Sequence, residues 1–566
     1  MLPFTSRRSP VLSTRGLVAT SQPLAVAAGL ETLSKGGNAA DAAITTAAAL
    51  NVTEPTSTGI GGDAFALYYD AKTGQVTALN ASGRAPKTLT LELLHSQLKI
   101  DHSQLTIPDP YHPHTVTVPG ACAGWCDLIE RHGRLPLADV LAPAIRLAEE
   151  GFPVAPITAH YWARGAANQL ARATNGHELT LDGRAPRAGE LFRNPGLART
   201  FRLVAGGGKD AYYRGPIAEA IVSVLREAGG VMSLDDLATH TSTWDTPIST
   251  TYRGYRVWEC PPNGQGLAAL LALNLLEGFD LTEHAPLSPQ RLHLMIEAMR
   301  LAFADTRWYV ADPAFNPSPV SSLLSKAYAD TRRKLIHPTR ATLDQIHGTP
   351  TSSSDTVYLT VVDGEGNACS FINSNYMGFG TGIVPQGWGF TLQNRGHNFT
   401  LDPTHPNALA PGKRPYHTII PGMITKDGGQ GTEDGGHETE DGEAQSSVFG
   451  LPSLFASYGV MGGFMQPQGH MQVAVGLIDD ALDPQAALDR PRFCIDDGEA
   501  GGRVALEEGI TFETLANLAG RGHNLVPTTG YGRSLFGRGQ VIVRDAASGV
   551  LWGGSDPRAD GCAMGV

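Results

Sequence analysis

The sequence predicts an α/β fold, and three observations support this prediction. Segments whose apolar residues recur at helical spacing, such as 24–35 and 290–304, share the chain with the segment 357–372, which is rich in β-branched and aromatic residues. Hydrophobic residues make up 42% of the chain, which is typical of a globular protein. The 66 glycines suit the many tight turns that join short helices and strands.

Length, charge and cysteine content bound the class of protein. At 566 residues, two domains are the default expectation. A formal net charge of −12 gives no reason to expect a nucleic-acid partner. No apolar run approaches a membrane span, and the N-terminus lacks the apolar core of a secretory signal, so we expect a cytoplasmic protein without a membrane partner. The six cysteines include no CxxC pair and do not form a disulfide framework in so long a chain.

Helical and strand patterns alternate in the first 80 residues. We expect a helix over 24–35 and a buried, alanine-rich helix over 38–50. Residues 59–69 predict a glycine turn that leads into a strand, and residues 76–80 are its expected hairpin partner. The letters GIGGD at 59–63 lack the spacing and the lysine of a phosphate-binding loop, so we interpret these glycines as sites of close backbone packing.

The middle of the chain, from 121 to 304, is largely helical in its pattern. A strand pair around 248–258 interrupts it. Glu297 and Arg300 are three residues apart, which predicts an ion pair on the surface or between helices. Residues 314–355 become polar and rich in proline, as expected of a linker. The clear helices of this region span 137–150, 217–228 and 290–304.

The most informative point is the junction between Asp355 and Thr356. Residues 349–355 are polar and turn-prone, whereas residues 357–372 predict a rigid hairpin with its turn at 363–367. A threonine at the start of a strand is common for packing reasons alone. A cut at this junction would, however, give Thr356 a free α-amino group. With a reference pKa of roughly 7.7–8.0, that amine can act as the general base for the threonine's own hydroxyl.

Several motifs in a fixed order give this junction its context. Upstream lie GGNAADAAI (36–44), GIGGDAF (59–65), VPGACAGW (118–125) and TPISTTYRGYRV (246–257). Downstream lie DTVYLTVVDGEGNACS (355–370), FGTGIV (379–384), LQNRG (392–396), GKRP (412–415) and MGGFMQPQGH (461–470). Together they resemble the γ-glutamyltransferase family of N-terminal-nucleophile hydrolases over nearly the whole chain.

The resemblance implies a four-layer αββα sandwich, one intertwined domain that is cut into two chains. The large chain would span residues 1–355, with a C-terminal linker at about 335–355. The small catalytic chain would span residues 356–566. Within it, the glycine-rich and acidic segment 426–447 predicts a disordered loop inserted between two strands.

The same resemblance implies a mechanism. Thr356 attacks the backbone carbonyl of Asp355, an ester forms by an N→O shift, and water releases the two chains. The exposed Thr356 then attacks a substrate amide, and the amides of Gly462 and Gly463 stabilise the oxyanion. One such donor changes the rate by roughly 10²–10³. The family needs neither a metal nor an organic cofactor, so none is expected.

The resemblance also implies the residues of a substrate pocket. Ser374 and Tyr376 stand where typical members have a threonine and an asparagine that order the nucleophile and the glutamyl group. Asn398 stands where an aspartate binds the α-ammonium group of the substrate. His417 and Thr418 replace two adjacent serines that hold its carboxylate.

An arginine that clamps this carboxylate is expected from the family, since its planar fork matches a carboxylate. The aligned position holds Ser82, and Arg84 follows two residues later. Arg395 in the NRG motif is a second candidate. At the other end of the pocket, the neutral amide of Asn398 replaces a charge-assisted contact worth about 1.5–3 kcal/mol.

Three functions are left open by the sequence. The first is a γ-glutamyltransferase or glutathione hydrolase, acting on small γ-glutamyl compounds. The second is an acylase or amidohydrolase for monoamides of dicarboxylic acids without the α-amino group, of the glutaryl or oxamate type. The third is a non-catalytic relative that is never processed. The presence of Thr356 and of the Gly462-Gly463 pair argues against the third.

Overall fold

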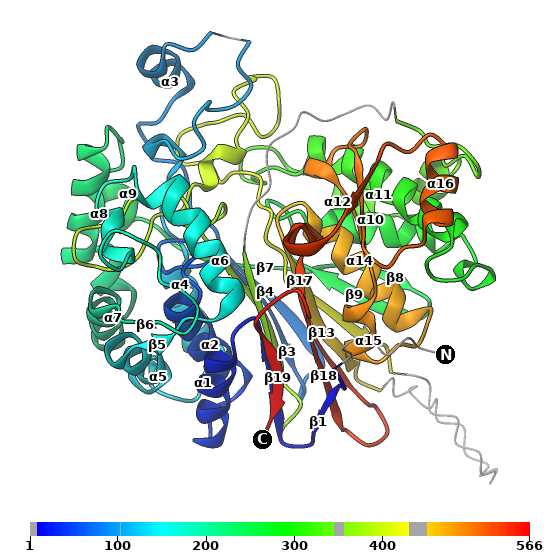
Figure 1. Cartoon of the computed structure of the whole chain (residues 1–566), viewed down its shortest axis with the longest axis horizontal. Coiled ribbons are helices and arrows are strands. Elements are labelled where there is room, and N and C mark those ends of the chain that lie inside the picture. The colour runs from blue at the N-terminus through cyan, green and yellow to red at the C-terminus, as the bar shows by residue number, and fades with distance from the viewer. Residues whose placement is uncertain (1–7, 102, 344–355, 429–449) are drawn as a thin grey trace, which may run out of the picture.

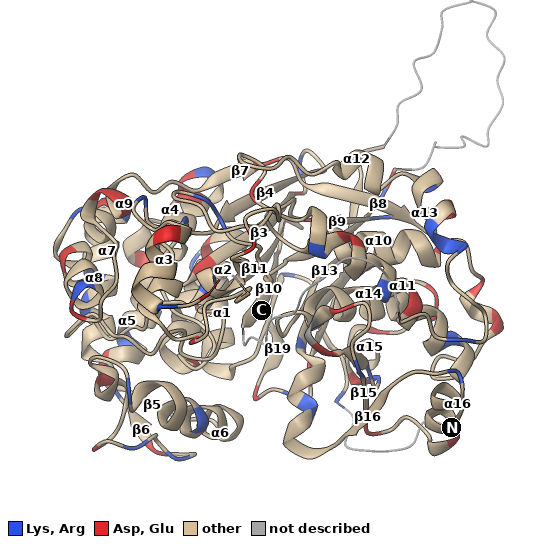
Figure 2. Ribbon diagram, turned by 90° about the horizontal axis from the view of Figure 1, so that it is seen from above, with Lys and Arg blue, Asp and Glu red and all other residues tan. Residues whose placement is uncertain are grey.

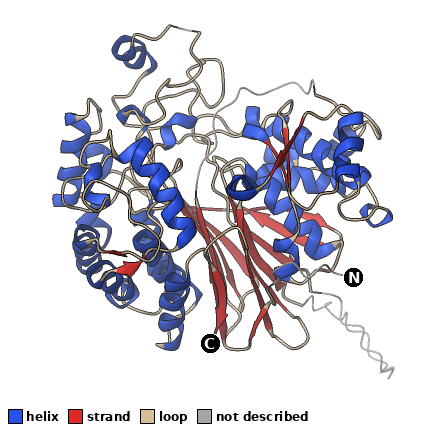
Figure 3. Cartoon of the chain, viewed as in Figure 1, coloured by secondary structure: helices blue, strands red, loops and turns tan. Residues whose placement is uncertain are grey.

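The structure is a computed structural model and describes residues 8–101, 103–343, 356–428 and 450–566. Two seven-stranded sheets face each other at its centre, and helices cover the outer face of each sheet (Figure 1, Figure 3). All neighbouring strands within these two sheets are antiparallel. The four layers confirm the predicted αββα sandwich.

Each sheet combines strands from distant parts of the chain. The first sheet has the order β1 (Val11–Ser13), β18 (Leu551–Ser555), β17 (Arg538–Arg544), β13 (Ser453–Met461), β12 (Gly422–Lys426), β9 (Tyr255–Glu259) and β8 (Ile248–Tyr252). The second has the order β19 (Cys562–Gly565), β2 (Gly16–Thr20), β10 (Val357–Asp363), β11 (Ala368–Ser374), β3 (Asp63–Asp70), β4 (Gln75–Ala81) and β7 (Thr243–Asp245). A small three-stranded sheet contains β14 (Phe493–Ile495), β15 (Val504–Glu507) and β16 (Leu525–Thr528). A two-stranded sheet contains β5 (Phe152–Pro153) and β6 (Leu191–Phe192).

The helices fall into two groups, one for each sheet (Figure 1). The second sheet is covered from the N-terminal half of the chain, by α1 (Pro23–Ser34), α2 (Ala39–Thr53), α4 (Ala121–His132), α5 (Leu137–Glu150), α6 (Pro156–Gly165), α7 (Pro195–Tyr213), α8 (Pro216–Glu227) and α9 (Leu234–Ala238). The first sheet is covered by α10 (Gly266–Leu276), α11 (Pro289–Tyr309), α12 (Val320–Leu323), α13 (Lys326–Arg333), α14 (Met465–Ile478), α15 (Pro484–Asp489) and α16 (Phe512–Gly520). Helix α3 (Leu91–Leu98) packs in a separate small cluster.

Strand β10 shows why the layers hold together. Its residues Val357, Leu359 and Val361 belong to the hydrophobic cluster shared with the N-terminal helices. The alternate residues Tyr358 and Val362 belong to the cluster between the two sheets. Since burying one such side chain contributes about 1.5–3 kcal/mol, both faces of the strand stabilise its position. The predicted hairpin with two apolar faces is therefore confirmed.

Helix α2 is buried along its whole length, as its alanines predict. Small side chains let a helix approach its neighbours closely, and α2 contacts α1, α5, β10 and β11. Asn38 caps its N-terminus: its side chain accepts from the amides of Ala40 and Asp41, while the Asp41 side chain accepts from the amide of Asn38. This reciprocal capping box satisfies amides that would otherwise lack partners inside the protein.

The predicted boundaries agree with the observed elements where local pattern decides them. Helix α5 has the predicted bounds, and the strands around 248–258 are β8 and β9. Helix α11 continues five residues past the predicted end, to Tyr309. Glu297 and Arg300 form the predicted ion pair at 3.5 Å, and because both side chains are buried, the alternative of a surface pair is excluded.

Two predicted segments lie largely outside the described residues. The linker at 335–355 is described only to residue 343, where it follows α12 and α13. The acidic segment 426–447 is described only to residue 428. The strands on either side of it, β12 and β13, are antiparallel neighbours, as expected for a segment inserted between two strands.

Charged residues lie mainly on the outer helices and loops, and few lie on the central strands (Figure 2). None of the described helices combines the length and the apolar character required to cross a membrane. Buried charges at the ends of central strands are therefore exceptions that require a physical reason.

Strand β10 of the second sheet faces strand β13 of the first sheet, and the start of β10 lies near the end of β13. The hydroxyl of Thr360 on β10 donates to Ser457 on β13 over 2.6 Å. Nearer the start of β10, the ring of Tyr358 packs against Gly459. The two strands thus run in opposite directions, and Thr356 lies at the end of the sandwich where β13 leads into a glycine turn.

Candidate active site

Thr356 is buried at the start of β10, between the two sheets. Its Oγ1 lies 3.0 Å from the Oγ of Ser374, the last residue of β11. The register of the hairpin causes this contact: Val357 pairs with Asn373, and Thr356 and Ser374 are the next residues toward the open end of the hairpin. The proposed nucleophile and Ser374 are thus brought together by the turn of a single hairpin.

Arg395, in the short helix η5 (Arg395–Asn398), is a fully buried cation beside this pair. Its Nη2 donates to Ser374 Oγ over 3.2 Å, and its Nη1 donates to Thr418 Oγ1 over 2.6 Å. The guanidinium lies over the ring of Tyr376, 4.4 Å from the centroid. Burial lowers the pKa of Arg395 to about 10, so it is still charged at neutral pH.

The partners of this guanidinium are hydroxyl groups. Among the described residues no carboxylate forms an ion pair with Arg395, and its Nε has no hydrogen-bond partner. A buried cation without a paired anion costs free energy, and the fork of an arginine matches a carboxylate. The site can therefore hold the carboxylate of a bound molecule next to Thr356.

Asp63, the first residue of β3, is a buried acidic residue that the sequence motifs did not predict as part of the site. Its carboxylate is occupied by four donors: the amides of Gly83 (2.9 Å) and Gly120 (3.3 Å) and the side chains of Gln393 (2.9 Å) and His417 (3.0 Å). The electrostatic effect of Asp63 also reaches Arg395. The carboxylate thus stabilises the loops around the pocket without forming an ion pair with that arginine.

His417 is a neutral imidazole in this arrangement. Its Nδ1 accepts from the amide of Ile419 at 3.3 Å, so its Nε2 carries the proton that it donates to Asp63. Burial, aided by the charge of Arg395, lowers the pKa of His417 to about 3. The only N–H group of the His417 ring is thus bonded to Asp63. Arg395 and Thr418 are therefore better placed than His417 to bind a carboxylate.

Tyr376 and Asn398 form a second pair in the pocket. Tyr376 has a φ of 81°, in the left-handed region that bulky residues rarely adopt. Its hydroxyl donates to Asn398 Oδ1 over 2.5 Å, and Asn398 Nδ2 donates to the carbonyl of Tyr416 over 3.1 Å. Both ends of the Asn398 amide therefore have protein partners.

The turn after β13 contains the predicted glycine pair. Gly462 has a φ of 136° and Gly463 a φ of 60°, values that favour glycine. Neither amide donates a hydrogen bond to another described residue. Gln265 donates to the carbonyls of Gly463 (2.8 Å) and Thr418 (2.6 Å), which fixes the turn against the pocket wall. Since α14 begins at Met465, the turn also lies at the positive end of a helix dipole.

Arg84 lies apart from this network. Its Nη1 donates to the carbonyl of Thr241 over 3.3 Å, and its charge affects the buried His240 and Arg414. The remaining predicted site residues within the described part of the chain form one connected group. Asp355, the other residue of the predicted cleavage point, lies outside the described residues.

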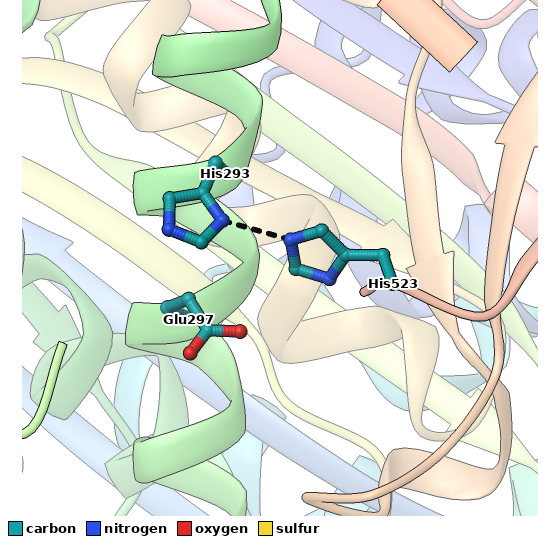
Figure 4. Close-up of side chains that lie close together, drawn as sticks. All are labelled: His293, Glu297 and His523. Carbon is teal, nitrogen blue, oxygen red and sulfur yellow. Dashed lines mark hydrogen bonds between the residues drawn. The ribbon is translucent and has the colours of Figure 1, made fainter. Parts of the chain in front are cut away.

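A separate cluster of titratable side chains lies on the other side of the first sheet. His293 and Glu297 of α11 and His523, which follows α16, are buried, and they could together hold a metal ion because their ligand atoms lie within 4.8 Å of one another (Figure 4). His293 Nδ1 lies 2.8 Å from His523 Nε2. Burial lowers the pKa of both imidazoles and raises that of the Glu297 carboxyl.

Neighbouring groups give this cluster a different role. The Nε of the buried Arg300 lies 3.5 Å from Glu297 Oε1, so the charge of the Glu297 carboxylate is already balanced by an arginine. A metal ion in this cluster would be repelled by that arginine. Glu297 Oε2 accepts from the amide of Thr342, and His293 Nε2 contacts the carbonyl of His337 at 2.7 Å. We interpret the cluster as a polar contact that holds the segment 337–342 against α11.

Comparisons with known proteins find relatives over nearly the whole chain. The model of the gamma-glutamyltranspeptidase family matches residues 25–437 and 446–566. The chain is 36% identical to the glutathione hydrolase-like YwrD proenzyme of Bacillus subtilis (strain 168), over 98% of this chain and 99% of the relative. It is 32% identical to the acylase ACY 1 proenzyme of Pseudomonas sp. (strain SE83), over 100% of this chain and 96% of the relative.

A solved structure shows the same architecture. The crystal structure of a cephalosporin acylase from Bacillus halodurans superposes with a TM-score of 0.88 and 46% sequence identity. The match covers 100% of this chain and 98% of that one.

Proposed function

Because this chain belongs to the γ-glutamyltranspeptidase family of N-terminal-nucleophile enzymes, we propose that it is a self-cleaving amidohydrolase with Thr356 as its nucleophile. Cleavage between Asp355 and Thr356 would give chains 1–355 and 356–566. Two observations support this division: Thr356 directly precedes the central strand β10, and the relatives of this chain are proenzymes.

The proposed reaction uses only groups of this chain and water. The α-amine of Thr356 takes the proton of its hydroxyl while the oxygen attacks the amide carbon. The amides of Gly462 and Gly463 stabilise the oxyanion. The carbon–nitrogen bond then breaks, the ammonium returns the proton to the leaving amine, and an ester remains on Thr356. Water attacks this ester with the same amine as base, which releases the acid.

The substrate class follows from one observation, the buried Arg395 without an ion pair. The arginine is separated from Thr356 by a single hydroxyl, that of Ser374. We therefore propose that the acyl group of the substrate carries a carboxylate a short distance from the scissile amide, and that Arg395 and Thr418 bind it.

Two acyl groups fit this description. The side-chain amide of Asn398 already has hydrogen-bond partners at its oxygen and its nitrogen. This favours monoamides of dicarboxylic acids without an α-amino group, such as glutaryl amides. Similarity to a glutathione hydrolase-like proenzyme favours γ-glutamyl compounds as the second candidate. Both are small-molecule amides, and the carboxylate requirement is common to them.

The test compares glutaryl anilide with pentanoyl anilide, which has the same chain length but no carboxylate. We expect kcat/KM to be at least tenfold higher for glutaryl anilide, the lower range of a charge-assisted contact. Arg395→Met should remove this preference, and Arg226→Met, a change at an exposed position of α8, should keep it. Intact mass shows whether each variant is processed. Equal hydrolysis of the two anilides by the wild-type protein would contradict the proposed substrate class.

A further inference from the structure

A groove of about 650 Å³ opens beside Gly462. Met377 and Phe379, from the loop that follows β11, also line it. The groove therefore reaches the proposed oxyanion site, and Arg395 is not among the residues that line it.

One wall of the groove is a single face of a helix. His160, Arg164 and Asn168 line it, and they are spaced four residues apart along α6 and the π-helical turn η2 (Ala166–Leu170). The π-turn is anchored by Gln169, which donates to the carbonyls of Met377 (2.6 Å) and Gly380 (2.7 Å). The wall therefore has a fixed position relative to the loop that carries Tyr376.

Aromatic rings dominate the contact surface of the groove. Tyr111, His160, Tyr161, Phe379 and Tyr531 all line it. His160 and Tyr531, the latter from the short helix η7 (Gly530–Phe536), are stacked at 4.1 Å with an interplanar angle of 8°. Tyr531 is 66% exposed, so this stack presents an open planar surface. Such a surface favours a flat ring as its ligand.

The charge of the groove is positive although the chain carries −12. Among the residues that the structure describes, Arg164 lines it, whereas no aspartate or glutamate does. Within the described part of the chain Arg164 has neither an ion pair nor a hydrogen bond. By contrast, Arg172 beside the groove is paired with Asp109 at 3.2 Å. An unpaired guanidinium in a groove without acids favours an anionic ligand.

We propose that this groove binds the amine half of the scissile amide, and that the preferred amine is a planar ring compound with an anionic group. The inference rests on the proposed function. With the acyl half held at Arg395, the other substituent of the carbonyl must leave the buried pocket, and the groove beside Gly462 is the opening that receives it. Tyr531 then stacks on the ring and Arg164 pairs with its anion.

The test uses glutaryl anilide and glutaryl meta-carboxyanilide, which share one acyl group. Wild-type protein should prefer the carboxylated amine roughly twofold to fivefold in kcat/KM, the size of an exposed charge contact. Arg164→Met should abolish this preference by lowering kcat/KM more for the carboxylated anilide than for the neutral one. Arg164→Lys and the distant Arg226→Met should keep the preference. Tyr531→Ala should lower kcat/KM for both anilides by roughly threefold to tenfold relative to the primary amide of glutaric acid. A preference that is equal in wild-type and Arg164→Met protein would overturn the proposal.

Binding of the free amines separates failure of the groove from failure of the proposed function. Aniline and meta-aminobenzoate are titrated into wild-type, Arg164→Met and Arg226→Met protein by ligand-observed NMR. Selective binding of meta-aminobenzoate that needs Arg164, without hydrolysis of either anilide, would support the groove and contradict the amidohydrolase. Hydrolysis of both anilides at the same rate, with no selective binding, would contradict the groove and support the amidohydrolase.

Discussion

The hydroxyl of Tyr376 takes the oxygen of Asn398 that a substrate ammonium group would need. Asn398 has no charge, and the hydrogen bonds of its amide to Tyr376 and Tyr416 fix its orientation. An α-ammonium group entering the pocket would thus compete with a short internal hydrogen bond and gain no ion pair. At the scale of single residues, this pair supports the proposal that the pocket accepts a des-amino acyl group.

Asn398→Asp tests this explanation. A carboxylate there gives the ammonium group a charged partner, so the ratio of kcat/KM for γ-glutamyl anilide over glutaryl anilide should rise by about one decade. Asn517→Asp adds the same charge on the exposed face of α16 and should leave the ratio unchanged. If the wild-type protein strongly prefers the γ-glutamyl substrate and Asn398→Asp does not alter that preference, another residue binds the ammonium group.

Single residues also mark the limit of prediction from sequence. Thr356, Ser374 and Arg395 lie in or near recognisable motifs, and the structure brings them together. Arg84 stands two residues from the aligned position, yet its side chain donates to the carbonyl of Thr241. The glycine motif at 59–63 ends in Asp63, and an acid at the start of an apolar strand was the signal available for it.

At the scale of elements, the turn between β13 and α14 is the part of the site with the strictest backbone requirement. Gly463 has a φ of 60°, where a side chain costs about 1–2 kcal/mol. Its carbonyl is held by Gln265, so the direction of the neighbouring amides is fixed before substrate binds. Such preorganised donors are what an oxyanion site requires.

Gly463→Ala should therefore lower kcat more than it raises KM, by at least tenfold, because a shifted amide weakens the oxyanion contact. Gly549→Ala is the matched control: its φ is 72°, so the backbone cost is similar, but it lies beyond β17 at a distance from the site. The measurement is kcat and KM of both processed variants by steady-state kinetics. Equal activity of Gly463→Ala and Gly549→Ala would exclude the glycine pair from the mechanism.

Elements were predictable from sequence where local pattern determines them. The bounds of α5 follow from its apolar spacing, and β10 from its β-branched residues. The burial of Arg300 was not predictable, because its guanidinium donates to the carbonyls of Ala500 and Gly502, two hundred positions away. A spacing of three residues in a helix gives no information about such distant partners.

At the scale of the whole molecule, the proposed cut divides both sheets between two chains. In the second sheet β10 and β11 would belong to the small chain and their neighbours β2 and β3 to the large one. In the first sheet β9 pairs with β12, and β1 with β18, across the same division. Neither chain could complete a sheet alone, so the two should remain one folding unit.

Processing and association can be tested together. Wild-type protein should show two chains on a denaturing gel but elute as one species under native conditions and unfold in a single transition. Thr356→Ala should stay a single full-length chain by intact mass, and Thr356→Ser should be cut more slowly, because both steps need the hydroxyl. A wild-type protein that remains one chain and is still active would contradict the scheme.

The pairing of Lys426 with Ser453 has a practical consequence. Lys426 is the last residue of β12 and Ser453 is the first residue of β13, so the two lie side by side at the end of β13 that is opposite the turn with Gly462. The natural sequence already places 26 residues between them, rich in glycine and acids. If a fluorescent or affinity tag were inserted between them, its two ends would be held close together, far from the proposed nucleophile. The position therefore offers a place to attach a reporter without altering the proposed nucleophile or the residues around it.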